Sequence, residues 1–319
     1  MVMDSLKILI VAGGLTHERD VSLRSGRRVA NLLRQGGHTV EVCDLNTQFL
    51  PTIAEFEPDV VWPLIHGSVG EDGSVQDLLE LIDFPYVGAT AGSCVLASAK
   101  PVAKALAQSA DVATPAWVTL TQSLFRQVGA PAVLNAILSN EVGLEFPLIV
   151  KPSNGGSALG LSKVATEDEL RSAMVDAFAY GDSLMVEQFI PGREIAVSIV
   201  DLTDGPEILP VVEIQTDDGD YDFDARYNTG RSLFFVPADL TEAELARVQD
   251  TAVTMHETLA LRHLSRMDLI LGEDGTVWFI DANVVPGMTD MSLFPQAAEA
   301  QNSFAQVLED IAQYARHDN

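Results

Sequence analysis

Cysteine, lysine and long apolar runs are all scarce in this chain of 319 residues. Its two cysteines, Cys43 and Cys94, are too few for a disulfide framework or a metal site, and their small or apolar neighbours indicate reduced core cysteines. No apolar run approaches the length of a membrane span. Residues 1–11 hold one lysine and a short apolar run, which fits a first strand better than a signal peptide. We therefore expect a cytoplasmic protein without a membrane partner.

Positively charged residues are also few, with 19 lysines and arginines against 46 aspartates and glutamates. The formal net charge of −27 argues against nucleic acid or an anionic membrane surface as a partner. Only five residues are lysines, and Lys100, Lys104 and Lys151 fall close to the motifs described below. In so acidic a chain, clustered cations indicate a site for an anionic ligand; the alternative is that they are ordinary solubilising lysines. With 47% apolar residues, the chain is long enough for two or three domains around a substantial core.

Strands and helices alternate over the first part of the chain, a pattern typical of a parallel α/β sheet. The elements predicted there are strands at 7–11, 39–44, 60–64 and 85–87, and helices at 20–35 and 75–81. A second lobe follows, with a helix at 100–109, a hairpin of strands 147–151 and 162–164, a helix at 167–177 and a strand at 184–188. A third lobe begins near residue 191, with strands at 195–200 and 208–214, a helix at 242–259, a second hairpin and a last helix near 303–314.

The second hairpin, over residues 266–283, carries the most informative chemistry. Asp-Gly at 274–275 favours a two-residue type I′ turn, which would pair Trp278 with Leu271. The same count gives the pairs further from the turn, Asp281 opposite Asp268 and Asn283 opposite Arg266. Since side chains two residues apart share a face of a strand, these four side chains are expected to point the same way.

Two aspartates placed opposite each other on a sheet repel, so this pairing needs an explanation. A divalent cation between Asp268 and Asp281 would reverse the sign of the interaction, and Asn283 adds a third oxygen ligand. Such an all-oxygen set suits Mg²⁺ or Mn²⁺. The alternative is an exposed hairpin with scattered acidic residues.

The second chemical signal is a glycine-rich loop at residues 151–160, placed between two predicted strands with Lys151 at the exit of the first. Backbone N–H groups of such a loop can contact phosphate oxygens while the lysine adds a charge. It is neither a Walker A loop nor a Rossmann turn, because it does not open a helix. The alternative is a flexible turn. Together with the acidic hairpin, the loop indicates a nucleoside triphosphate held between two lobes.

A series of short segments also carries a family resemblance, because of their order and spacing. The segments are Gly13 to Ser22, His66-Gly67, Gly70 to Gly73, Pro85 to Gly88, Val150 to Ser153, Gly156-Ser157, Arg226-Tyr227, Arg266 to Asp268, Asp281 to Asn283, Pro286 to Thr289 and Ser292-Leu293. Over essentially its whole length, the chain resembles the D-alanine–D-alanine ligases of the ATP-grasp superfamily.

The resemblance implies an α/β fold of ATP-grasp architecture. An N-terminal parallel α/β lobe at residues 1–96 would carry substrate residues. Two α+β lobes would grip the nucleotide, the central one at 97–190 with the glycine-rich loop and the C-terminal one at 191–319 with the metal hairpin. Members of this family are commonly homodimers.

The implied reaction phosphorylates the carboxylate of one D-alanine with ATP and lets the amine of a second displace phosphate. The product, D-alanyl-D-alanine, is a peptidoglycan precursor. The metal ions, Mg²⁺ or Mn²⁺, would be held by Asp268, Asp281 and Asn283. The resemblance assigns the ATP phosphates to Lys100, Lys151 and Arg226, and the adenine or ribose to Glu187 and Glu194.

The remaining implied roles concern the two amino acids. Glu18 would pair with the ammonium group of the first D-alanine, and Arg266 would stabilise the oxyanion of the tetrahedral intermediate. Glu18, Ser157 and Tyr227 would hydrogen-bond to one another as the site closes. His66 would lie near the first substrate, although a lone histidine is as readily a loop residue with satisfied hydrogen bonds. The resemblance assigns the carboxylate of the second D-alanine to Ser292 and Leu293, and it makes Gly287 a further substrate-binding residue.

Four departures from the family pattern leave room for another substrate. Ala99 replaces a common aspartate, and Asp281 stands where glutamate is usual, which shortens a metal ligand by one methylene. Arg226 replaces a lysine by a planar fork, and residues 284–285 are two valines in place of a polar pair. The alternatives are therefore an ATP-grasp ligase for other amino acids and a non-catalytic nucleotide-binding protein, which the nearly complete set of site residues disfavours.

Overall fold

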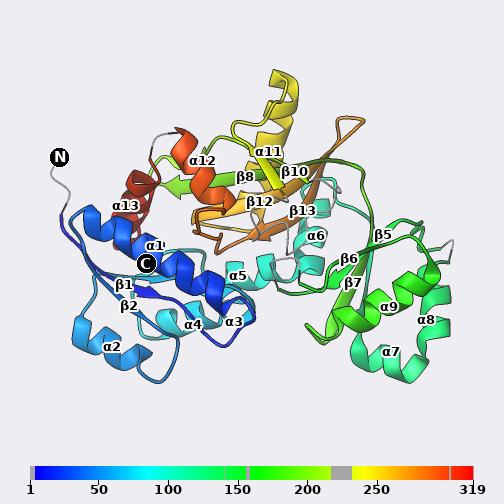
Figure 1. Ribbon diagram of the computed structural model, residues 1–319, viewed down its shortest axis with the longest axis horizontal. Helices are drawn as coiled ribbons and strands as arrows, with labels where there is room; N and C mark the ends of the chain where they lie inside the picture. Colours follow the sequence, from blue (N-terminus) through cyan, green and yellow to red (C-terminus); the bar gives the residue numbers. More distant parts are fainter. Residues whose placement is uncertain (1–3, 140, 156–158, 217–231, 302, 319) are drawn as a thin grey trace.

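The computed structural model describes residues 4–139, 141–155, 159–216, 232–301 and 303–318, arranged around three sheets (Figure 1). Ser157, Arg226 and Tyr227 lie outside these described residues. None of the helices in the described ranges combines the length and apolarity needed to cross a membrane.

The first sheet is parallel, as its alternating sequence predicted, with strand order β2-β1-β3. Its elements are β1 (Lys7–Val11), α1 (Arg19–Gln35), β2 (Thr39–Cys43), α2 (Phe49–Phe56), β3 (Val60–Pro63), α3 (Ser68–Glu71) and α4 (Ser74–Leu81). The strand predicted at 85–87 was wrong, because pairing there is limited to one parallel bridge between Val61 and Tyr86. Two further helices, α5 (Ala91–Ser98) and α6 (Lys100–Ser109), lead away from this sheet.

The second sheet is antiparallel, with strand order β4-β7-β5-β6. Its elements are β4 (Trp117–Thr121), α7 (Gln122–Val128), α8 (Ala130–Ile137), β5 (Leu148–Pro152), β6 (Ser162–Val164), α9 (Glu167–Ala177) and β7 (Ser183–Gln188). The predicted hairpin around the glycine-rich loop is confirmed, since β5 pairs with β6. This sheet and its helices enclose a separate apolar core, which includes Leu134, Leu148, Leu170 and Leu184.

The third sheet has the order β11-β10-β8-β12-β13, and β9 pairs with β8. Its elements are β8 (Gly192–Leu202), β9 (Gly205–Ile208), β10 (Val212–Thr216), β11 (Ser232–Phe235), α11 (Glu242–Thr258), β12 (His263–Gly272), β13 (Val277–Asn283), α12 (Leu293–Gln301) and α13 (Phe304–Ala315). The single strand predicted at 208–214 was wrong. It is two strands, β9 and β10, that pair with successive parts of β8 on either side of Pro210, which has no N–H for a ladder.

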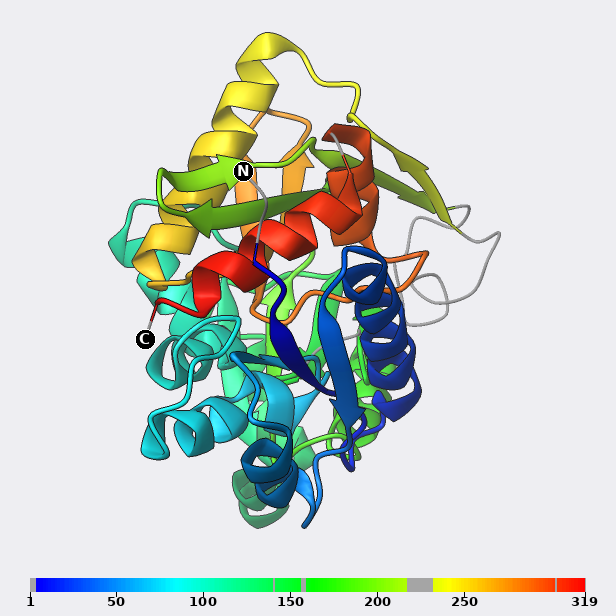
Figure 2. The ribbon, with the colours of Figure 1, turned by 90° about the vertical axis from the view of Figure 1, so that its left-hand side faces the viewer.

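One apolar core joins the first sheet to the third. Ile8 and Trp62 belong to the same cluster as Met267, Phe279 and Leu308. Helix α13 lies between the two sheets and packs on α1, β3, β8 and β12 (Figure 2). The residues of β12 and β13 therefore share an apolar core with the first sheet, while the β5–β6 hairpin belongs to the separately packed second sheet.

Candidate active site

The β12–β13 hairpin sets the register of the predicted metal residues. Arg266 faces Asn283 and Asp268 faces Asp281, which confirms both pairs. Nearer the turn the prediction was wrong by one residue, because Trp278 pairs with Ile270. The connection is a three-residue loop rather than a two-residue turn: Gly272 and Thr276 close it by a backbone hydrogen bond, and Gly275 adopts a φ of +80°. A bulge beside Asp268 absorbs the difference.

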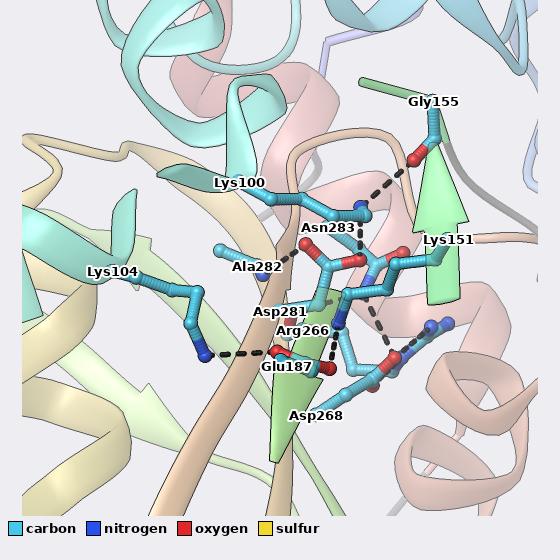
Figure 3. Close-up of polar contacts among 10 residues, drawn as sticks. All are labelled: Lys100, Lys104, Lys151, Gly155, Glu187, Arg266, Asp268, Asp281, Ala282 and Asn283. Atoms are coloured by element: carbon cyan, nitrogen blue, oxygen red, sulfur yellow. Dashed lines mark hydrogen bonds and ion pairs between the residues drawn. The ribbon is translucent and has the colours of Figure 1, made fainter. Parts of the chain in front are cut away.

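Both hairpin carboxylates are neutralised by side chains of the chain itself (Figure 3). Arg266 donates from Nε and Nη2 to the two oxygens of Asp268, at 2.7 and 3.0 Å. Asn283 Nδ2 lies 3.2 Å from Asp268 Oδ2. Lys100 Nζ lies 2.7 Å from Asp281 Oδ2. A face with two opposed carboxylates and a side-chain amide suits a hard divalent cation, although no group of three or more His, Cys, Asp or Glu gathers at a metal-binding distance within the described ranges.

Lys100 ties the hairpin to the glycine-rich loop. Besides Asp281, its Nζ contacts the carbonyl oxygen of Gly155 at 2.8 Å, and its backbone N–H donates to the carbonyl of Ser153 at 3.1 Å. Its side chain is buried, so this ammonium group faces the interior between the second and third sheets. Among the described residues, this ammonium contacts one carbonyl and one carboxylate oxygen, and it is well placed to contact an anionic group that enters between them.

A second charge cluster surrounds Glu187 on β7. Its carboxylate lies 2.5 Å from Lys151 Nζ and 3.0 Å from Lys104 Nζ, and all three side chains are buried. Burial acts to raise the pKa of Glu187, but the two ammonium groups outweigh it, and the pKa lies below its usual value. Burial lowers the pKa of Lys104 to about 8, although Glu187 partly opposes the shift. The cluster holds one more cation than it holds anions, which favours an anionic ligand.

The first sheet contributes a further pair of carboxylates. Glu18 directly precedes α1 and is buried, and Gly67 approaches it so closely that a Cβ there would lie 2.7 Å from Glu18 Oε2. Glu71, at the end of α3, has its pKa raised to about 8 by burial and then by the negative charge of Glu18. The Nδ1 of His66 lies 3.9 Å from Glu71. Two acidic groups that repel in this way suit a single cation such as an ammonium group.

The segment after β13 forms the remaining side of the site. Gly287 packs against Ser292, whose Oγ would lie 2.7 Å from a Cβ at that glycine. Ser292 Oγ in turn accepts a hydrogen bond from the Thr289 N–H at 3.0 Å. Leu293 is buried as the first residue of α12. Glu194 lies further along β8, half-buried and opposite Ile270.

The structure thus brings most of the predicted residues together, and the ligand-binding roles assigned to them stay predictions. Sequence reasoning included Glu71 only as part of a family segment and gave it no role, although it stands five residues after His66. It noted Lys104 but gave it no role, although Lys104 stands one helical turn after Lys100. It also gave no role to Ser25 and Arg28 on α1, whose partners lie more than 40 and 250 residues away along the chain.

Two family profiles and several sequence relatives match this chain. The family profile described as "D-ala D-ala ligase C-terminus" matches residues 106–313, and the one described as "D-ala D-ala ligase N-terminus" matches residues 46–89. The D-alanine–D-alanine ligase of Nitrosomonas europaea is 38% identical over 92% of this chain and 92% of its own length. That of Hydrogenovibrio crunogenus is 36% identical over 92% of this chain and 89% of its own length.

Solved structures agree with the sequence relatives. The D-alanine–D-alanine ligase from Bacillus anthracis complexed with ATP superposes with a TM-score of 0.80 at 25% identity, covering 98% of this chain and 97% of that one. The VanG D-Ala:D-Ser ligase from Enterococcus faecalis gives a TM-score of 0.80 at 27% identity, covering 98% of this chain and all of that one. With this fold and these matches, the chain belongs to the D-alanine–D-alanine ligase family.

Proposed function

We propose that this chain joins two D-alanine molecules at the expense of ATP, giving D-alanyl-D-alanine, ADP and phosphate as a step toward peptidoglycan precursors. One observation carries the proposal: the opposed aspartates of the β12–β13 hairpin lie against Lys100, which also reaches the glycine-rich loop at Gly155 (Figure 3). Carboxylates for a metal ion and ammonium groups for phosphates thus meet where the second and third sheets approach each other.

The first half-reaction transfers the terminal phosphoryl group of ATP to the carboxylate of the first D-alanine, releasing ADP. Phosphoryl transfer needs positioning and charge neutralisation more than covalent help from the protein. Lys100 and Lys151 would contact the phosphates, and Arg226 would join them. Asp268, Asp281 and Asn283 would hold Mg²⁺, which when bound would further neutralise the phosphate charge. Glu187 would bind the adenine or ribose, with Glu194 as a second candidate.

In the second half-reaction, the amine of the second D-alanine attacks the carbonyl carbon of the acyl phosphate, loses a proton, and phosphate leaves. Glu18, with Glu71 beside it, would hold the ammonium group of the first amino acid. Arg266, fixed by its two hydrogen bonds to Asp268, would face the oxyanion of the tetrahedral intermediate. We assign Ser157 and Tyr227 to closure of the site with Glu18.

The second amino acid would lie against the segment that follows β13, with Gly287, Ser292 and Leu293 as its binding residues and His66 near the first. We assign the lobes to residues 1–96, 97–190 and 191–319. Because the reaction consumes ATP and makes a wall precursor, we place it in the cytoplasm. We also propose a homodimer, on the basis of the family resemblance, which light scattering on the purified protein would test.

The test is to incubate the purified protein with Mg-ATP and D-alanine, following ADP release and identifying the product by mass. We expect one D-alanyl-D-alanine for each ADP, and no turnover when EDTA removes the metal. A panel with D-serine and other amino acids should be run in parallel, because one solved relative is described as a D-Ala:D-Ser ligase. Turnover only with another amino acid, or ATP binding without any ligation, would contradict the proposal.

A further inference from the structure

Helix α1 contacts the segment between β13 and α12, which is the proposed binding segment for the second amino acid. The face that makes this contact carries Ser25 and Arg28, one turn apart. Glu18, the proposed ligand of the first amino acid, immediately precedes the same helix. Helix α1 and the residue that precedes it therefore contact both halves of the proposed substrate site.

Arg28 makes the larger set of contacts. Its Nη1 donates to the carbonyl oxygens of Met288 and Thr289, at 3.2 and 2.9 Å. Its Nε lies 2.9 Å from the carboxylate of Asp290, and its guanidinium stacks over the ring of Phe304, 4.8 Å from the ring centroid. Since the Asp290 side chain is 89% exposed, that ion pair is screened and contributes little. The two carbonyl contacts are the ones that fix the course of the backbone.

Ser25 adds a fully buried link between the two amino-acid sites. Its Oγ accepts a hydrogen bond from the Met288 N–H at 3.1 Å and lies 3.0 Å from His66 Nε2. Burial lowers the pKa of His66 to about 4, so the imidazole is neutral near pH 7. Because Oγ already accepts from the backbone of Met288, the serine O–H is available to donate to Nε2. Ser25 thus couples His66, near the first substrate, to the backbone of the second-substrate segment.

The backbone of residues 288–289, which Ser25 and Arg28 contact, lies next to the residues proposed to bind the second amino acid. Met288 directly follows Gly287, and Thr289 donates from its N–H to the Oγ of Ser292 at 3.0 Å. A movement of residues 288–289 would therefore shift both Gly287 and Ser292. Small displacements of binding groups change the affinity for a small amino acid considerably, because few contacts hold it.

We propose that Ser25 and Arg28 are positioning residues for the second amino acid, holding residues 288–289 so that Gly287 and Ser292 bind it. This inference rests on the proposed function. Within the described residues, Arg28 contacts the second-substrate segment and Phe304 of α13 but no residue assigned to the first amino acid, whereas Ser25 contacts that segment and His66. The two residues therefore have different kinetic signatures.

The experiment measures initial rates of ligation over a wide range of D-alanine concentrations and, separately, of ATP concentrations. Arg28→Met should raise the Michaelis constant for the second D-alanine about tenfold, as expected for loss of charge-assisted hydrogen bonds. The constants for ATP and for the first D-alanine should change less than about twofold, within the usual effect of a surface substitution. Ser25→Ala should raise the constants for both D-alanines.

Two further variants serve as controls. Arg27→Met makes the same change at an exposed position of the same helix and should leave all constants unchanged. Arg28→Lys keeps the positive charge but loses the planar guanidinium. Its Michaelis constant for the second D-alanine should therefore lie between those of the wild type and Arg28→Met. If Arg28→Met does not fold by circular dichroism, Arg28→Lys and Ser25→Ala still decide the question.

The outcomes separate this inference from the proposed function. A wild-type protein that makes no dipeptide contradicts the proposed function. If the wild type ligates D-alanine but Arg28→Met leaves the Michaelis constant for the second D-alanine unchanged, the inference is overturned while the proposed function stands. Equal changes in the constants for ATP and both D-alanines would also overturn it, because they would indicate a general loss of structure.

Discussion

Replacing Lys104 with methionine is expected to remove a pH dependence of stability that this one buried ammonium group creates. The Lys104 side chain is 0% exposed, with its Nζ 3.0 Å from Glu187 and 2.7 Å from the hydroxyl of Thr114. Burial lowers its pKa from the usual 10.5 to about 8. Between these values the unfolded chain holds the proton and the folded chain does not. The free energy of unfolding therefore rises with pH over this window.

The size of the effect follows from the shift. At about 1.4 kcal/mol per pH unit, a pKa lowered from 10.5 to about 8 corresponds to about 3 kcal/mol. Below pH 8 the folded protein bears this full cost of keeping the ammonium buried, and most of it is relieved by pH 10. Methionine has similar length and no charge, so Lys104→Met lacks this pH-dependent contribution to the free energy of unfolding. Its lost hydrogen bonds add an offset that changes little with pH, because the lowered pKa of Glu187 keeps that group ionised throughout.

The assay is guanidinium-induced unfolding of the ligand-free protein at pH 7, 8, 9 and 10. Between pH 7 and pH 10, the free energy of unfolding of the wild type should rise by about 2 kcal/mol more than that of Lys104→Met. The control is Lys163→Met, at an exposed lysine, which should run parallel to the wild type. Parallel curves for Lys104→Met and the wild type would refute the reasoning, because Lys104 would then titrate alike in the folded and unfolded chains.

Three further predictions concern the site and its support. Glu18→Gln should lower ligation about 100-fold, as for loss of one partner of a buried charge pair, while calorimetry shows unchanged ATP binding; surviving activity would contradict the ammonium site. Asp281→Asn should raise the Mg²⁺ concentration for half-maximal ADP release at least about tenfold, and an unchanged titration would remove Asp281 from the metal ligands. Gly70→Ala should destabilise the fold by more than about 3 kcal/mol, because its Cβ would lie 1.9 Å from the carbonyl oxygen of Ile65. Gly92→Ala in α5, where a Cβ meets nothing within 4 Å, should instead be neutral or stabilising by up to about 1 kcal/mol in a melting experiment; equal melting temperatures for the two variants would contradict this.

Local signals in the sequence predicted much of the fold. Helices α6 and α9 begin and end where the sequence indicated, since α6 has a proline in its first turn and Thr166 caps α9 by accepting from the Glu169 N–H. The same kind of signal could have divided the strand predicted at 208–214, because Pro210 interrupts it.

The β12–β13 hairpin, which carries the predicted metal ligands, shows how far local sequence signals can predict structure. The pairs at Asp268 and Arg266 were correct because alternation fixes which side chains share a face. The loop was misjudged by one residue, and the bulge beside Asp268 compensated for the error before it reached the site. The predicted pairing of Asp268 with Asp281 was therefore correct partly because the one-residue error in the loop and the unpredicted bulge cancel each other.

Contacts between distant segments could not be predicted from the pattern. Lys104 and Glu187 lie 83 residues apart, and Arg28 meets Thr289 over 261 residues. Each residue taken alone is an ordinary charge on a helix or strand. Only tertiary packing brings these pairs together; α6 packs on β13, and α1 packs on α13.

The most direct test of the central claim is the fate of the carboxylate oxygens of the first D-alanine. The protein is given ATP, Mg²⁺ and D-alanine labelled with ¹⁸O in both carboxylate positions, and the released phosphate is analysed by mass spectrometry. If the carboxylate accepts the phosphoryl group and phosphate then leaves the carbonyl carbon, each phosphate carries one ¹⁸O and the peptide carbonyl keeps another. Unlabelled phosphate beside newly formed dipeptide, or release of pyrophosphate and AMP, would contradict the account.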